Sequence, residues 1–144
     1  MRILALDLGT KKCGLAISDP LQIIAQPLKT VFYARQDFAT LINALKTIIE
    51  QYEPVVKIIL GFPQTNHSKL NPTAKLVLKF AKILKAEWSK LEIVLVDESY
   101  SSQRADHLMQ TIGLSNKTKK QTRDKLAAQQ ILEDYLVKNT CGNL

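Results

Sequence analysis

The chain opens with two apolar runs of strand length that a tight turn joins, LALDLGTKKCGLAISD at residues 4–19. Short apolar runs on both sides of a glycine-containing turn predict a β-hairpin, so the fold must start with an antiparallel pair of strands. The first run ends with an acid, Asp7, and two lysines follow Gly9. This arrangement suits a turn that binds a nucleotide phosphate. It suits equally a carboxylate that holds a metal ion for cutting nucleic acid.

The apolar runs that follow alternate with helical repeats. Residues 23–31 predict a third strand, which Pro27 places at an edge or an end. Apolar side chains then recur at helical spacing over residues 38–52, and Pro54 ends this helix. The run VVKIILGF at residues 55–62 predicts a buried strand.

The second half of the chain continues the alternation. After the polar loop GFPQTNHSKLNP, we expect a helix that Asn71 caps and Pro72 begins. Its core-facing stripe is Val77, Phe80, Ala81, Leu84 and Trp88. The run LEIVLVDES predicts a strand over residues 91–99, and two helices are expected at about 102–112 and 121–137. The last helix should turn Ala127, Ala128, Ile131, Leu132, Tyr135 and Leu136 inward.

This order of elements predicts an α/β protein. Strands come first and then alternate with helices, which indicates a mixed β-sheet with an antiparallel start, parallel additions and helices packed on its faces. A length of 144 residues fits a single domain over residues 1–144. The hydrophobic fraction of 46% and the charged fraction of 23% are typical of a globular protein with its own core.

Three features of the sequence indicate in which compartment of the cell the protein is found. No apolar run approaches the roughly 20 residues that a membrane span needs. The start MRILALDLG is typical of a strand rather than of a signal peptide. Cys13 and Cys141 are far apart and have no metal-ligand spacing, so we expect free thiols. We therefore expect a cytoplasmic protein without membrane contact.

The charge of the chain favours polyanionic partners. Lysine and arginine number 20 against 13 acids, a formal net charge of +7. One cluster comprises Lys69, Lys75, Lys79, Lys82, Lys85 and Lys90. A second comprises Lys117, Lys119, Lys120, Arg123 and Lys125. A solvated helix face and a solvated loop are the alternative interpretation, but the size of the excess favours nucleic acid.

Three acids occupy positions where chemistry is plausible. Asp7 lies at the end of the first strand, Glu98 follows Asp97 at the end of the last strand, and Asp124 lies in the first turn of the last helix. Carboxylates are unfavourable in strands and costly in a dry site unless a partner compensates them. Mg²⁺ or Mn²⁺ takes oxygen ligands at about 2.1 Å and can activate water for phosphodiester cleavage.

Each acid also has a structural interpretation. Asp7 could form a turn before Gly9, Glu98 could cap a helix, and Asp124 could favour a helix dipole. Other candidates for chemistry are weaker. His67 and His107 lack partners at metal spacing, and Ser101 and Ser102 lack a nucleophile elbow and are better helix caps.

Four motifs, DLGTKKCGLAISD, GFPQTNHSKLNPTA, DESYSSQRA and KKQTRDKLAAQQILEDYL, resemble the YqgF family in their order and intervals. Its members are small bacterial proteins described as Holliday junction resolvases or pre-16S rRNA nucleases. The resemblance covers essentially the whole chain. It implies a ribonuclease H-like fold, with Asp7, Glu98 and Asp124 as the acidic site.

The chain departs from the family pattern at a few positions. Ser99 stands where the family usually has arginine, and Ser101 and Ser102 stand where it has two threonines. His67 and Ser68 replace an Asp-Gly pair in the loop. These departures concern the substrate-facing loop and a phosphate contact, whereas all three acids are kept.

The leading hypothesis is a metal-dependent endonuclease for structured RNA or branched DNA, acting on pre-16S rRNA or a Holliday junction. In it Asp7, Glu98 and Asp124 are catalytic and hold Mg²⁺ or Mn²⁺. The expected nucleic-acid-binding residues are Lys11, Lys12, Asn66, Lys75, Lys79, Lys82, Lys119, Lys120 and Arg123. A ribosomal precursor particle is a candidate partner. Both a monomer and a homodimer are compatible with the sequence, and junction cleavage would favour the dimer.

Two alternatives belong to other classes. DLGT also resembles the phosphate loop of sugar kinases and actin-like ATPases, which need a second similar domain to close over the nucleotide. A chain of 144 residues leaves no room for that domain. The other alternative is a nucleic-acid-binding accessory protein without catalysis, which the altered loop motif keeps open.

Overall fold

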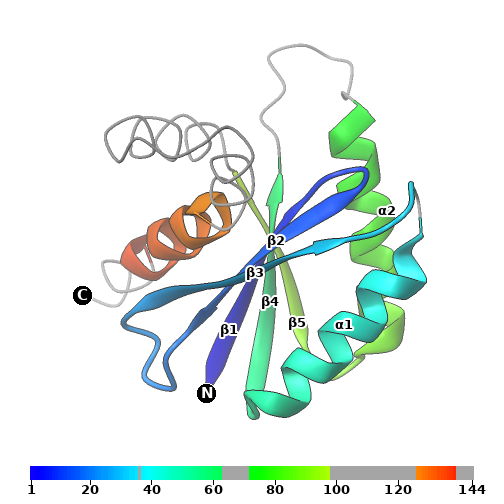
Figure 1. Cartoon of the computed structure of the whole chain (residues 1–144). Helices are drawn as coiled ribbons and strands as arrows, with labels where there is room; N and C mark the ends of the chain where they lie inside the picture. Colours follow the sequence, from blue (N-terminus) through cyan, green and yellow to red (C-terminus); the bar gives the residue numbers. More distant parts are fainter. Residues whose placement is uncertain (36, 63–71, 98–125, 139–144) are drawn as a thin grey trace.

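A five-stranded mixed sheet forms the centre of the protein (Figure 1). The computed structural model describes residues 1–35, 37–62, 72–97 and 126–138. Its elements are β1 (Arg2–Leu8), β2 (Lys12–Ser18), β3 (Ala25–Phe32), α1 (Phe38–Gln51), β4 (Val55–Phe62), α2 (Pro72–Glu87), β5 (Glu92–Asp97) and a C-terminal helix over 126–138. The predicted helix over 102–112, the loop over 63–71 and the start of the last helix lie outside the described residues.

The strands lie in the order β3-β2-β1-β4-β5. β1 pairs with β2, and β2 with β3, in antiparallel orientation, whereas β1–β4 and β4–β5 are parallel pairs. The predicted antiparallel start with parallel additions is therefore confirmed. β3 lies at the edge of the sheet, one of the two positions that Pro27 allowed, because proline has no N–H to donate to a neighbouring strand.

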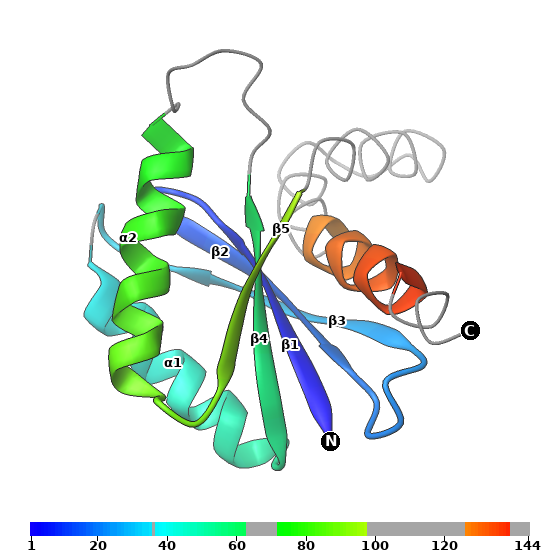
Figure 2. The ribbon, with the colours of Figure 1, turned by 180° about the vertical axis from the view of Figure 1, so that it is seen from behind.

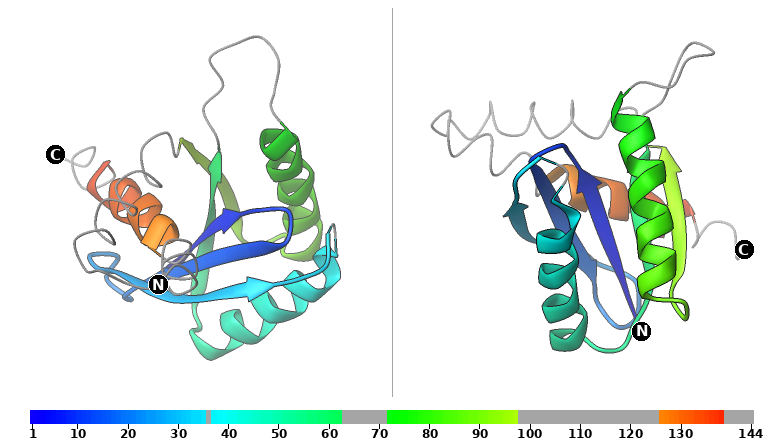
Figure 3. Two further views of the ribbon diagram at one scale, coloured as in Figure 1. Left: turned by 45° about the horizontal axis from the view of Figure 1, so that its top comes forward. Right: turned by 90° about the vertical axis from the view of Figure 1, so that its right-hand side faces the viewer.

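Helices cover both faces of the sheet, and strand alternation decides which side chains meet which helix. In β1, Leu4, Leu6 and Leu8 belong to the cluster under α1 and α2. Ile3 and Ala5 belong to the cluster under the C-terminal helix. The views from behind and from the side show these two layers (Figures 2 and 3). The predicted arrangement of helices on both faces is confirmed.

Local signals explain α1. The Asp37 carboxylate caps the helix, accepting hydrogen bonds from the Thr40 amide at 3.4 Å and the Thr40 hydroxyl at 2.7 Å. Its buried stripe is Phe38, Leu41, Ile42, Leu45 and Ile48. The Phe38 ring meets the Phe80 ring of α2 with centroids 5.0 Å apart, so the two helices share one core.

α2 begins at Pro72, the position that the sequence predicted. Its buried residues are Ala74, Val77, Phe80, Ala81 and Leu84. Lys75, Lys79 and Lys82 are exposed on the other side of the helix, as expected from the spacing. The helix therefore presents three cations to solvent while its apolar stripe holds it on the sheet.

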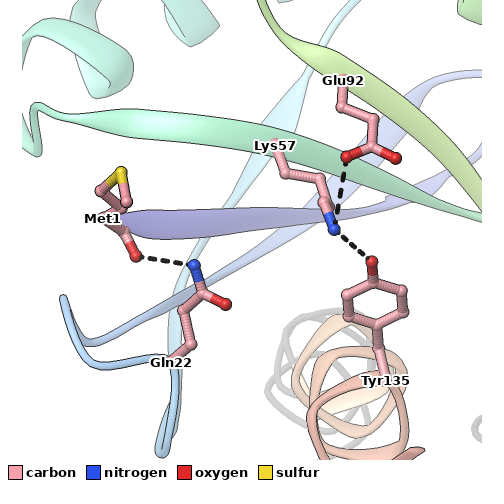
Figure 4. A network of polar contacts seen from close by, with 5 residues as sticks. All are labelled: Met1, Gln22, Lys57, Glu92 and Tyr135. Carbon is pink, nitrogen blue, oxygen red and sulfur yellow. Dashed lines mark hydrogen bonds and ion pairs between the residues drawn. The ribbon is translucent and has the colours of Figure 1, made fainter. Parts of the chain in front are cut away.

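The C-terminal helix buries the residues that the sequence assigned to its inner side, with Tyr135 half-buried. A polar contact ties its end to the sheet (Figure 4): Lys57 Nζ donates to Tyr135 Oη at 2.6 Å and lies 3.4 Å from a Glu92 carboxylate oxygen. Burial lowers the pKa of Lys57, but the Tyr135 hydrogen bond and the Glu92 charge outweigh it, so the pKa is raised. Gln129 also donates to the Ala25 carbonyl at 3.3 Å.

Asp19 organises the loop between β2 and β3. Its carboxylate accepts hydrogen bonds from the Ile23 and Ile24 amides at 2.6 and 2.8 Å, which closes an Asx-type turn. Hydrogen bonds from Ile24 and then from other amides outweigh desolvation and lower the pKa of Asp19. Gln22, at a φ of 59°, donates from its side chain to the Met1 carbonyl at 3.2 Å (Figure 4).

The ranges that the structure describes contain no helix that is long and apolar enough to cross a membrane.

Candidate active site

Asp7 is the penultimate residue of β1, the central strand of the sheet. Strand alternation places it on the same face as Ile3 and Ala5, which is the face under the C-terminal helix. It is half-buried, unlike the fully buried residues that precede it. The carboxylate therefore stands where the hydrophobic layer on this face gives way to solvent.

The neighbours of Asp7 across the sheet have no side chains. Gly14 of β2 pairs directly with Asp7. On the other side Leu6 pairs with Leu60, and Gly61 is the next residue of β4. Neither glycine adds a side chain beside the carboxylate on its own face of the sheet. The absence of those side chains suits a cation and a phosphate oxygen, which need direct access to the carboxylate.

The parallel strands end at the same edge as Asp7. Gly61 and Phe62 of β4 pair with Val96 and Asp97, the last two residues of β5. Val94 and Val96 pack in the cluster under the C-terminal helix, so β5 and β1 contribute to one face. Carboxyl ends of parallel strands are where α/β folds gather site residues. This edge is therefore the candidate active site.

Tyr33, which sequence reasoning missed, supports the turn after Asp7. Its hydroxyl donates to the Gly9 carbonyl and lies 3.0 Å from the Lys12 carbonyl oxygen. Its amide donates to the Lys11 carbonyl at 2.9 Å. Burial, and then the negative charges of Cys13 and Asp7 in their ionised forms, raise the pKa of Tyr33, so the hydroxyl stays a donor. No local pattern singles out this tyrosine, because its partners lie more than 20 residues earlier.

The basic residues expected to bind nucleic acid fall into two described groups. Lys11 is exposed and Lys12 half-buried in the turn beside Asp7. Lys75, Lys79 and Lys82 are exposed on α2, which lies on the opposite face of the sheet. The remaining expected binders lie outside the described residues: Asn66, Lys119, Lys120 and Arg123.

Of the three expected metal ligands, the structure describes Asp7. Glu98 and Asp124 lie outside the described residues, so their convergence with Asp7 stays a prediction. In the described ranges, no group of three or more histidine, cysteine, aspartate or glutamate residues could hold a metal ion. Asp7 itself fits a hard cation, since it offers carboxylate oxygens at a partly exposed strand end.

Known proteins match this chain over nearly its whole length. Residues 1–138 match the family described as RuvX, Holliday junction resolvase. The chain is 39% identical to a protein of Mesomycoplasma hyopneumoniae strain 7448 over 135 residues and 40% identical to one of Geobacillus sp. strain WCH70 over 136 residues. Both are named "Putative pre-16S rRNA nuclease". The matches cover 94% of this chain and 93% and 97% of those proteins.

A solved structure confirms the predicted fold. Thermus thermophilus RuvC in complex with a Holliday junction substrate aligns with a TM-score of 0.54, over 97% of this chain and 96% of its own. The two sequences are 14% identical, so this likeness shows the fold alone. That fold is the ribonuclease H-like fold of the resolvases.

Proposed function

Because this chain belongs to the RuvX/YqgF family of nucleases, we propose that it is a metal-dependent endonuclease that cleaves phosphodiester bonds of structured nucleic acid. The observation that carries the proposal is the position of Asp7. Its carboxylate stands at the end of the central strand, between two glycine positions, with Lys11 and Lys12 in the turn beside it. This combination suits a cation and a phosphate backbone better than a purely structural turn.

Sequence spacing supports Glu98 as a second ligand. It follows Val94 and Val96 at the two-residue spacing of a strand, and both valines pack on the face where Asp7 stands. Asp124 is supported in the same manner. It precedes Ala128 by four residues and Ile131 by seven, which is the spacing of one helical stripe, and both pack on that face.

In the proposed mechanism Asp7, Glu98 and Asp124 would hold Mg²⁺ or Mn²⁺. Such a metal, when bound, would supply the activation of water and the compensation of charge on the leaving oxygen. Lys11 and Lys12 would bind the phosphate backbone next to the cleaved bond. The apolar layer under the C-terminal helix, including Ala5, would limit access of bulk water to the inner side of Asp7.

We propose precursor ribosomal RNA as the substrate, since the two relatives at 39% and 40% identity are both named for pre-16S rRNA. A four-way DNA junction is the second candidate, which the description of the matching family favours. The kinase-like alternative receives less support, because residues 1–138 all match the nuclease family.

The test compares cleavage by the wild type, Asp7→Asn and Glu50→Gln. Both substrates are incubated side by side with Mg²⁺ and with Mn²⁺. Glu50 is an exposed carboxylate on α1, so its replacement is a matched loss of one charge away from the site. We expect cleavage of the precursor RNA by the wild type and Glu50→Gln, and a loss of at least about 10²-fold in Asp7→Asn.

Binding measurements on the same proteins separate catalysis from affinity. Asp7→Asn should still bind the RNA, because every lysine remains. Full cleavage by Asp7→Asn would contradict the role of Asp7. Binding without cleavage by the wild type, under both metals and on both substrates, would favour the accessory-protein alternative instead.

A further inference from the structure

The turn that follows Asp7 directs its backbone carbonyls to a single distant residue. Gly9, Lys11 and Lys12 each present a carbonyl oxygen to Tyr33, two of them to its hydroxyl and one to its amide. The Tyr33 hydroxyl is 24 residues from Gly9 in sequence. The amide contact continues the pairing of β2 with β3, whereas the contacts of the hydroxyl are additional to that pairing.

The turn is also closed tightly on itself. The Gly9 amide donates to the Lys12 carbonyl at 2.8 Å. A Cβ on Gly9 would lie 3.0 Å from that same carbonyl oxygen, closer than side-chain carbons normally approach. Gly9 and Tyr33 therefore hold the Lys12 carbonyl from two sides. Together, the Gly9 amide and the Tyr33 hydroxyl restrict the conformation of the backbone from Gly9 to Lys12.

Tyr33 and Asp7 lie on opposite faces of the sheet. Tyr33 is 7% exposed and packs in the cluster under α1 and α2, with Leu8 and Cys13. Asp7 is on the face under the C-terminal helix. Tyr33 is thus separated by the sheet from the side where substrate would meet Asp7. The hydroxyl would act on cleavage through the turn that it contacts.

We infer that Tyr33 is a positioning residue of the nuclease site: by holding the Gly9 and Lys12 carbonyls, its hydroxyl sets the place of Asp7 and of the lysines in the turn. The inference rests on the proposed function. Gly9 is two residues from Asp7, so a shift of its peptide rotates the end of β1. Displacements of about 1 Å at a reacting group can cost about 10²-fold in rate.

The test uses Tyr33→Phe, which keeps the ring in the core and removes the hydroxyl alone. Tyr52→Phe is the matched control. Tyr52 packs against the same cluster, and its ring lies 5.4 Å from the Arg2 guanidinium at the beginning of β1. Three quantities are measured in each variant: the Mn²⁺ concentration at half-saturation by electron paramagnetic resonance, the hydrogen exchange of the Gly9 amide, and kcat against KM on precursor RNA.

We expect Tyr33→Phe to raise the Mn²⁺ midpoint and lower kcat, each by about five- to tenfold, with a smaller rise in KM because Lys11 and Lys12 shift with the turn. Exchange of the Gly9 amide should become faster. Tyr52→Phe should leave all three at wild-type values. Gly9→Ala disturbs the same carbonyl, so Gly9→Ala and Tyr33→Phe together should cost less than the product of their separate effects.

The outcomes distinguish this inference from the proposed function. A Tyr33→Phe protein with lowered thermal stability but wild-type Mn²⁺ midpoint, Gly9 exchange and kcat would show a purely structural tyrosine and overturn the inference. If Asp7→Asn also cleaves fully, the proposed site itself is wrong. If Asp7→Asn is inactive while Tyr33→Phe equals the wild type, only the positioning role fails. If Tyr33→Phe does not fold, Gly9→Ala alone must raise the Mn²⁺ midpoint, or the role of the turn is refuted.

Discussion

The surroundings of the Asp7 carboxylate are formed by residues that lie beside it only in the folded sheet. Gly14 and Gly61 add no side chain on its face, and Leu6 and Leu8 pack in the core on the other face. An apolar layer does not solvate a charge, so a half-buried carboxylate is favourable only with polar or charged partners. A bound cation would be one such partner.

Replacing Asp7 should therefore keep or raise the melting temperature without metal and reduce the stabilisation that Mg²⁺ provides. If Asp7, Glu98 and Asp124 converge, removing one charge relieves repulsion, so Asp7→Asn should melt at the same or a higher temperature than the wild type without metal. Mg²⁺ should raise the wild-type melting temperature by mass action and leave Asp7→Asn nearly unchanged. Thermal melting with and without Mg²⁺ checks both. Strong destabilisation of metal-free Asp7→Asn would indicate a structural aspartate.

Asp19 provides a pH-dependent prediction. Because the amides of Ile24 and its neighbours lower its pKa in the folded protein, the charged form stabilises the fold above the usual pKa of 3.8. This stabilisation is lost as the pH falls through the folded pKa. Asp19→Asn should melt below the wild type at about pH 7, and the difference should shrink below about pH 3.8. A constant difference across melting curves at several pH values would contradict the assignment.

Among the elements, the C-terminal helix packs on the face of the sheet that carries Asp7. Its apolar stripe packs on Ile3, Ala5 and Ile59, and Lys57 binds its last turns through Tyr135. The proposed ligand Asp124 precedes this segment. The anchoring of the helix therefore matters for function as well as for stability.

Tyr135→Phe tests this anchor. The variant keeps the ring on Lys57 and removes the hydroxyl at 2.6 Å, so we expect the free energy of unfolding to fall by about 1–2 kcal/mol. Urea unfolding measures the change. Lys57→Met removes the other partner, and the double variant should cost less than the sum of the two single changes. Additive costs would show that the two side chains do not depend on each other.

At the scale of the whole molecule, one group of exposed lysines lies away from the proposed catalytic site. The exposed lysines of α2 lie on the layer opposite Asp7, whereas Lys11 and Lys12 lie beside it. A long, structured nucleic acid could contact both only by extending around the edge of the sheet. Affinity and cleavage should accordingly respond to different residues.

The salt dependence of binding measures the contribution of α2. We expect log affinity to fall linearly with log salt, and Lys75, Lys79 and Lys82 replaced together by glutamine should reduce that slope by about 2–3 if each contacts a phosphate. The control replaces Lys29, Arg35 and Lys138 by glutamine; all three are exposed and lie outside the basic cluster of residues 69–90, so the loss of charge is equal but spread over the surface. Fluorescence anisotropy across a salt series gives both slopes. Equal slopes for the two triple variants would show that the α2 lysines are a solvated face.

The sequence by itself determined the described elements of this protein and the inner faces of their helices. Short apolar runs mark the strands, repeats near 3.6 mark α1 and α2, and Pro54 and Pro72 mark where helices end and begin. It also indicated the edge position of β3 through Pro27. These features could be predicted because each depends on side chains within a few residues along the chain.

Only the tertiary structure decided which residues surround Asp7. The order β3-β2-β1-β4-β5 brings Gly14 beside it and Gly61 close to it from the other side. It also brings Tyr33 beneath the turn from the far end of the edge strand. Strand pairing and side-chain contacts across the sheet join positions far apart in sequence. No local pattern of propensity or periodicity therefore contains them, and the support of the candidate site had to be found in the fold.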